Sequence, residues 1–82
     1  MYEPDKAKML RMLAGEYEGY VHTSERRLVV LKLVEHRTDL RVPPQDRALL
    51  TYPEIARRAC TTERTIWRIL KRNRETGVEH GQ

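Results

Sequence analysis

The chain has very little cysteine and no long hydrophobic segment. One cysteine in 82 residues excludes an internal disulfide, and no CxxC or Cys/His spacing is available to bind a structural zinc ion. No apolar run reaches the roughly eighteen residues that a membrane span needs, and residues 1–10 lack the apolar core of a signal peptide. We therefore expect a cytoplasmic protein with one small domain over residues 1–82, held together by packed apolar side chains.

Groups that would support catalysis are also missing. The histidines are His22, His36 and His80; they lie far apart, and no acid–histidine–nucleophile arrangement occurs. We therefore predict that the protein is not an enzyme and that it has no catalytic residue, metal ion, cofactor or small-molecule ligand.

Basic residues, in contrast, are concentrated toward the carboxyl end. Residues 1–41 contain eight Lys or Arg and seven Asp or Glu, whereas residues 57–74 contain seven basic residues and only one acid, Glu63. The second segment therefore carries a net charge of 7 − 1 = +6. This bias predicts a polyanionic partner, and the alternative is a merely solvated cationic helix face.

Apolar residues recur at helical spacing through most of the chain. Met9, Leu10, Leu13 and Tyr17 form one stripe, with Gly15 inside the same segment, where an interior glycine costs about 1 kcal/mol relative to alanine. We predict an all-α fold, a small three- to four-helix bundle without a wing. The expected elements are helices over residues 5–18, 24–37, 52–59 and 62–75 and a frayed tail over residues 78–82.

Local residues predict where these helices begin and end. The segment "LVVLKLV" is apolar around most of its girth, so its helix should be central to the core. Pro43 and Pro44 break the pattern and predict a loop, with a turn of helix around residues 44–49. The expected caps are Ser24 or Thr23 for the second helix, a capping box of Thr51 and Glu54 for the third, and Thr62 or Thr61 with a left-handed Gly77 for the last.

Residues 52–71, "YPEIARRACTTERTIWRILK", resemble the helix-turn-helix of the lactose-repressor family and of related bacterial and phage regulators. The positions that match are Ile55 and Ala56 before the turn, Ala59 at its edge, Thr62 at the start of the second helix, and Ile66 and Ile69 beneath it. Cys60 stands where the family usually has glycine, and a left-handed backbone at a residue with a Cβ costs roughly 1 kcal/mol or more. That substitution leaves open whether the turn keeps the family's conformation.

The resemblance implies that residues 62–75 form a recognition helix in the major groove of double-stranded DNA. Arg64 and Arg68 would then pair with guanine, and Glu63 would accept a hydrogen bond from a cytosine amino group. The implied contacts with the DNA backbone are Arg57, Arg58, Thr62, Thr65, Trp67, Lys71, Arg72 and Arg74. Each of these assignments has a competing interpretation. Trp67 could instead lie in the core, and Arg57 and Arg58 could simply be solvated on the short helix. Glu63 could stabilise the helix N-terminus electrostatically without contacting DNA.

The leading hypothesis is sequence-specific binding of double-stranded DNA by a transcriptional regulator such as a repressor. The order of helices, with the helix-turn-helix near the end, is also similar to the DNA-binding domains of conjugative-plasmid stability and segregation proteins. That similarity implies a bacterial protein associated with the nucleoid or a plasmid, which binds repeated sites. One module touches few base pairs, so we expect a homodimer or several copies on direct repeats. The alternatives are a protein-interaction module and a basic RNA-binding helical domain.

Overall fold

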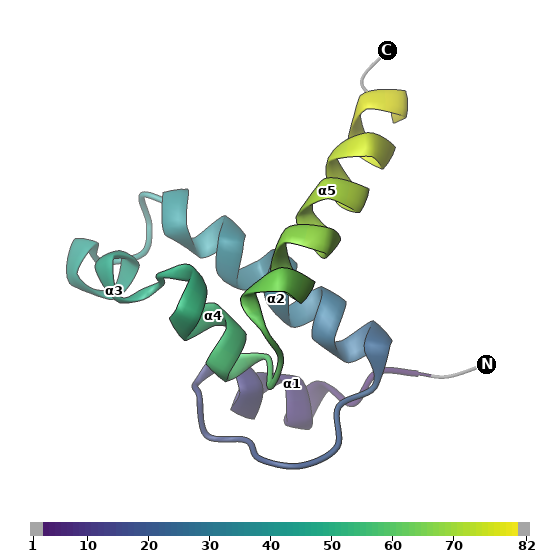
Figure 1. Cartoon of the computed structure of the whole chain (residues 1–82). Helices are drawn as coiled ribbons and strands as arrows, with labels where there is room; N and C mark the ends of the chain where they lie inside the picture. The colour runs from purple at the N-terminus through teal and green to yellow at the C-terminus, as the bar shows by residue number, and fades with distance from the viewer. Residues whose placement is uncertain (1–2, 81–82) are drawn as a thin grey trace.

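The computed structural model describes the backbone of residues 3–80 and the side chains of residues 3–75. Within this part of the chain there are five α-helices and no strand, so the all-α prediction is confirmed (Figure 1). The helices are α1 (Lys6–Leu13), α2 (Thr23–Thr38), α3 (Pro44–Leu49), α4 (Tyr52–Arg58) and α5 (Glu63–His80). None of the described helices combines the length and the hydrophobicity that crossing a membrane requires.

Helix α1 ends at Leu13, well before residue 18, where the sequence predicted its end. Gly15 adopts a left-handed conformation with φ +76°, and its N–H donates to the Met12 carbonyl oxygen at 3.0 Å. The next N–H, that of Glu16, donates to the Arg11 carbonyl oxygen at 2.9 Å, which completes a Schellman motif. Gly15 therefore terminates the helix and is not an interior glycine. Tyr17 lies in the following loop, where it still packs against the core.

The cap of α2 is His22 and not Ser24 or Thr23 as predicted. Nδ1 of His22 accepts a hydrogen bond from the Ser24 N–H at 3.1 Å, while the Glu25 carboxylate accepts one from the His22 N–H at 3.0 Å. Glu25 is completely buried and also pairs with Lys8 Nζ at 2.8 Å, which raises the pKa of Lys8. This ion pair joins the amino-terminal ends of α1 and α2.

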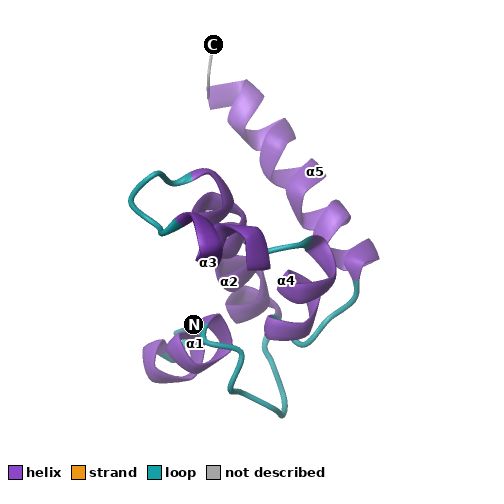
Figure 2. Ribbon diagram, turned by 90° about the vertical axis from the view of Figure 1, so that its left-hand side faces the viewer, coloured by secondary structure: helices purple, strands orange, loops and turns teal. Residues whose placement is uncertain are grey.

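The core is built around α2, which contacts each of the other four helices (Figures 1 and 2). Val29, Val30 and Leu33 of α2 are almost fully buried, in agreement with the central position predicted for the "LVVLKLV" segment. The side chains that complete the buried cluster are Met12, Val21, Leu50, Ile55, Ala56, Ala59 and Ile66. The core therefore fixes α4 and the beginning of α5 against α2.

Helix α3 matches the turn of helix expected around residues 44–49. Thr51 caps α4 as predicted, since its hydroxyl oxygen accepts a hydrogen bond from the Glu54 N–H at 3.3 Å. The reciprocal half of the expected capping box is absent, because the Thr51 N–H donates to the Leu49 carbonyl oxygen at 3.0 Å. The Glu54 carboxylate is thus free to bind other groups.

Helix α5 is longer than predicted. It begins after Thr62, whose hydroxyl oxygen accepts a hydrogen bond from the Thr65 N–H at 3.3 Å, and it continues through Gly77 to His80. Gly77 is therefore not the terminating residue that the sequence indicated. Glycine permits a left-handed cap but does not impose one, since its cost inside a helix is only about 1 kcal/mol. The predicted frayed tail is helical over residues 78–80, and residues 81–82 lie outside the described part of the chain.

Candidate nucleic-acid interface

Residues 59–62 form a tight turn between α4 and α5. Cys60 in this turn has φ +56°, its N–H donates to the Arg57 carbonyl oxygen at 3.2 Å, and the Thr61 N–H donates to the Ala56 carbonyl oxygen at 2.9 Å. These two bonds make a Schellman motif in which a cysteine takes the place typical of glycine. The turn therefore keeps the left-handed conformation despite the Cβ of Cys60.

Packing of the Cys60 side chain offsets part of this conformational cost. Its thiol Sγ lies 3.5 Å from the Tyr17 carbonyl oxygen, and the side chain packs at the margin of the core. A left-handed residue with a Cβ costs about 1–2 kcal/mol, which is comparable with the gain from burying a small apolar group. Cys60 thus acts as a small core residue that joins the turn to the loop after α1.

Buried residues on both sides of the turn fix how α5 leaves the body of the molecule. Ile55 and Ala59 before the turn and Ile66 after it are completely buried. Ile69 and Leu70, farther along α5, pack against the core only in part, and Asn73 is exposed although the sequence placed it on the same inward face. The reason is that α5 extends beyond the other helices after its first turns (Figure 1), so no element covers Asn73.

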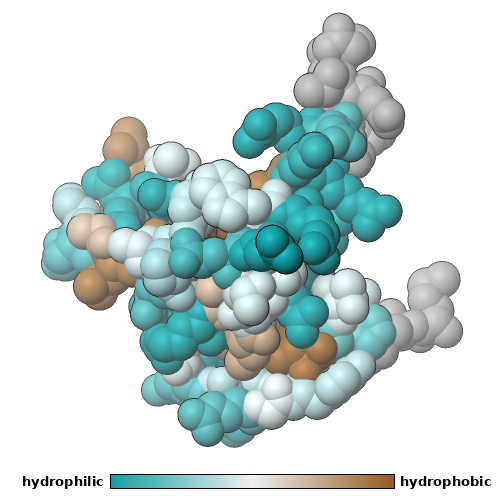
Figure 3. All heavy atoms as spheres, viewed as in Figure 1, coloured by the Kyte–Doolittle hydropathy of each residue, from teal (hydrophilic) through white to brown (hydrophobic). Residues whose placement is uncertain are grey.

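The outward face of α5 is strongly basic. Arg64, Arg68 and Lys71 project opposite Ile66 and are exposed, and among the residues that the structure describes they form no ion pair. The other predicted contact residues of α5 and its N-cap that are exposed are Thr62, Glu63, Trp67, Arg72 and Arg74, whereas Thr65 is half-buried. In Figure 3, hydrophilic residues predominate over the coloured part of this helix. The structure therefore brings the predicted α5 residues together on one accessible helix.

Trp67 is neither a core residue nor an isolated surface residue. Its side chain is 51% exposed, and its ring centroid lies 4.6 Å from that of Tyr52 with a tilt of 53°. The guanidinium carbon of Arg37 lies 4.5 Å from the centroid of the same Tyr52 ring. Arg37, Tyr52 and Trp67, which we call the aromatic stack, thus come from α2, α4 and α5. Sequence reasoning missed Arg37 and Tyr52, because nothing in the local pattern shows which helices meet there.

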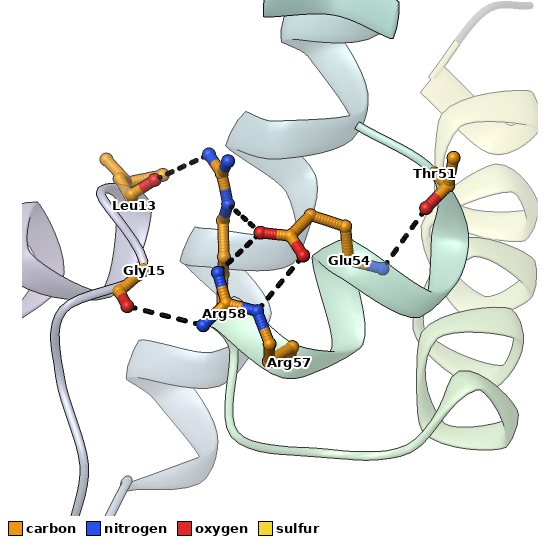
Figure 4. A network of polar contacts seen from close by, with 6 residues as sticks. All are labelled: Leu13, Gly15, Thr51, Glu54, Arg57 and Arg58. Atoms are coloured by element: carbon orange, nitrogen blue, oxygen red, sulfur yellow. Dashed lines mark hydrogen bonds and ion pairs between the residues drawn. The ribbon is translucent and has the colours of Figure 1, made fainter. Parts of the chain in front are cut away.

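Arg57 and Arg58 have partners within the molecule (Figure 4). Glu54 accepts hydrogen bonds from Arg57 Nε at 3.0 Å and from Arg58 Nε at 2.8 Å. The same two arginines donate to carbonyl oxygens at and just after the carboxyl end of α1, Arg58 to Leu13 at 3.1 Å and Arg57 to Gly15 at 3.4 Å. These bonds attach α4 to α1, and they place two cations at a helix C-terminus, where the helix dipole favours positive charge. Contact of these arginines with a nucleic acid stays a prediction.

The two arginines differ in how accessible they remain. The Arg58 side chain is only 20% exposed, whereas that of Arg57 is 58% exposed. Their hydrogen bonds lower the pKa of Glu54 to about 2, with the bond from Arg57 as the larger cause. Glu54 therefore stays ionised and holds both guanidinium groups. This arrangement gives Arg58 in particular a structural role.

No protein-family model, curated protein or solved structure matches this chain. Among the described residues, no three His, Cys, Asp or Glu side chains are grouped so that they could hold a metal ion.

Proposed function

We propose that the protein binds double-stranded DNA in a sequence-specific manner, with α4 and α5 as a helix-turn-helix and α5 as the recognition helix. The observation that carries this proposal is the exposed face of Arg64, Arg68 and Lys71. These side chains form no ion pair with any residue that the structure describes, and the opposite side of their helix is fixed by buried Ile66. When this face binds a polyanion, no ion pair within the described residues has to be broken first. The major groove, about 12 Å wide, accepts one α-helix.

The base-reading groups in this proposal are Arg64, Arg68 and Glu63. The two arginines lie one helical turn apart, about 6 Å along the axis, which suits bidentate hydrogen bonds with guanine O6 and N7 at nearby base pairs. Glu63 in the first turn of α5 accepts a hydrogen bond from a cytosine amino group. The proposed phosphate contacts are Thr62, Thr65, Lys71, Arg72 and Arg74, which position the helix without reading sequence.

The aromatic stack holds Trp67 at the side of the recognition helix. Because Tyr52 supports one part of the indole, the exposed part of Trp67 is held in a restricted orientation. A pre-oriented indole N–H donates to a phosphate oxygen with little loss of side-chain entropy. Arg57 and Arg58 position α4 on α1 in this proposal, and Arg57, the more exposed of the two, is the one left able to reach a phosphate.

The proposed biological role is that of a transcriptional regulator or of a plasmid stability and segregation protein that binds repeated sites in the bacterial cytoplasm. A single recognition helix contacts few base pairs, so useful specificity requires a homodimer on a palindrome or several copies on direct repeats.

Selection of bound sequences from a pool of random DNA duplexes tests this proposal directly. We expect an enriched motif that contains guanine at two nearby positions, and the arrangement of repeated motifs gives the spacing between copies. Affinity for the selected duplex, measured at fixed salt, should exceed that for a scrambled duplex by at least about a thousandfold for a complete site. A duplex RNA of the same sequence serves as control, because its major groove is too narrow for α5. Equal binding to all DNA duplexes, or no binding at about 50 mM salt, would contradict the proposal.

A further inference from the structure

Helices α1 and α2 leave an apolar groove between them on the surface. The groove has a volume of about 400 Å³ and is lined by Met9, Leu10 and Leu13 of α1 and by Leu28 and Val29 of α2. Leu10 is 66% exposed and Leu28 is 46% exposed, whereas Val29 at the bottom is buried. The groove therefore opens from the core to solvent between two leucine walls.

Among the residues that the structure describes, the charged ones that line this groove are two lysines, Lys6 of α1 and Lys32 of α2. Lys6 forms no ion pair within the described residues, and Lys32 has only a loose, exposed one with Glu35 at 3.9 Å. No acidic residue of the described chain lines the groove. Its charge is therefore positive, and it is available to an acidic ligand.

The two lysines lie toward opposite ends of the groove. The Asp5 N–H and Lys8 Nζ both bind Glu25, so the amino-terminal ends of α1 and α2 lie together, and Lys6 belongs to this end. Lys32 follows Glu25 by seven residues along α2. At 1.5 Å per residue, Lys32 therefore lies about 10 Å beyond Glu25 along α2, which is two turns of an α-helix. The leucine walls lie between them.

We propose that this groove binds an amphipathic helix of a partner protein, with a leucine pair that enters the groove and acidic residues two turns apart that pair with Lys6 and Lys32. In helix-in-groove recognition an amphipathic helix lays apolar anchors into a hydrophobic groove. Here the leucine pair at i+3 and i+4 supplies the anchors, and acidic residues at i and i+7 complement the positive charge of the groove. None of the residues that line the groove belongs to α5, so the partner and DNA occupy different surfaces. A second copy of the chain fits less well, since two such grooves face to face would bring like charges together.

A synthetic helical peptide of about four turns, with leucine at i+3 and i+4 and glutamate at i and i+7, is the probe. Its fluorescence anisotropy and the amide chemical shifts of the full chain report binding. We expect saturable binding, with shifts confined to α1 and α2, and at least about tenfold weaker binding of a matched peptide with lysine in place of glutamate. In the double variant Lys6→Glu, Lys32→Glu this preference should reverse.

Two further variants make the test specific. Leu10→Asp should abolish peptide binding while DNA affinity stays unchanged, and because Leu10 is largely exposed the variant should remain folded. Arg64→Ala with Arg68→Ala should leave peptide binding intact. Equal binding of both peptides overturns the proposal, and so do shifts centred on α5, which would mean that the acidic peptide merely occupies the DNA-binding face. If the chain self-associates and Leu10→Asp removes that self-association, the partner-helix proposal is also overturned, because the groove would then bind a second copy of the chain.

Discussion

Cys60 is the residue at which backbone conformation and packing oppose each other. Its left-handed conformation at φ +56° is unfavourable for any residue with a Cβ, while its thiol packs beside the Tyr17 carbonyl group. Cys60→Gly removes the conformational cost but also loses packing and adds entropy to the unfolded chain, so its free energy of unfolding should lie within about 1 kcal/mol of wild type. Cys60→Val, which is β-branched, should be at least about 1 kcal/mol less stable than Cys60→Gly.

Urea denaturation of both variants measures this difference. A valine variant as stable as the glycine variant would mean that the turn does not adopt the left-handed conformation.

Arg64 and Arg68 are the residues on which sequence preference depends in our proposal. Replacement of either by alanine should reduce affinity for the selected DNA site by about 1–3 kcal/mol and relax the preference at one base position. Arg74→Ala is the matched control, because it removes an exposed arginine of the same helix that is assigned to phosphate. Binding assays on the selected and the singly mutated sites measure both effects. If all three variants weakened every site equally, the assignment of base and phosphate contacts would be wrong.

At the scale of elements, Glu54 joins α4 to α1 through two arginines. Since its pKa in the folded protein is about 2 against an ordinary value of 4.5, folding favours the ionised form. The stabilisation is therefore complete at pH values above the ordinary pKa and is lost as the pH falls from there toward about 2.

Glu54→Gln lacks this titration. It should be less stable than wild type near about pH 6, and the difference should shrink as the pH is lowered through this window. Denaturation curves across that pH range measure the difference, and one that stays constant with pH would show that Glu54 ionisation does not contribute.

The aromatic stack connects α2, α4 and α5 at one place. Tyr52→Ala removes the ring that contacts both Arg37 and Trp67, so stability should fall by about 0.5–1.5 kcal/mol beyond the loss of buried area. Trp67, the only tryptophan, should then show red-shifted fluorescence emission and a weaker contribution to DNA binding. Tyr52→Phe keeps the ring and should behave like wild type. An unchanged emission spectrum in Tyr52→Ala would indicate that Tyr52 does not hold Trp67.

For the whole molecule, the placement of charge matters more than the total of +4. Each phosphate contact contributes about 0.9 to the slope of log affinity against log salt concentration. Lys71→Ala and Arg74→Ala should therefore each lower this slope by about 1. Arg58→Ala should leave the slope unchanged but reduce the free energy of unfolding by about 1–3 kcal/mol, because the Leu13 carbonyl group loses its partner and Glu54 keeps only Arg57. If Arg58→Ala lowered the salt slope, Arg58 would be a phosphate contact after all.

Much of the fold follows from local sequence patterns. The spacing of apolar residues predicted the all-helical class, the central helix α2 and the basic outward face of α5, because helical periodicity alone decides which side chains share a face. The errors at Gly15, His22 and Gly77 concern helix ends. Several residues near each end can serve as a cap, and the sequence does not show which one the backbone uses.

The sequence by itself determined that this chain forms helices and that one of them is basic on the face away from Ile66. Only the tertiary structure decided which of the basic residues are free. Arg57 and Arg58 resemble the arginines of α5 in sequence, but they bind carbonyl groups more than forty residues away, while Arg64 and Arg68 form no ion pair in the part of the chain that the structure describes. The aromatic stack and the groove between α1 and α2 likewise depend on contacts between distant segments. Local patterns set the direction of a side chain within its helix, but packing of the helices sets its partners.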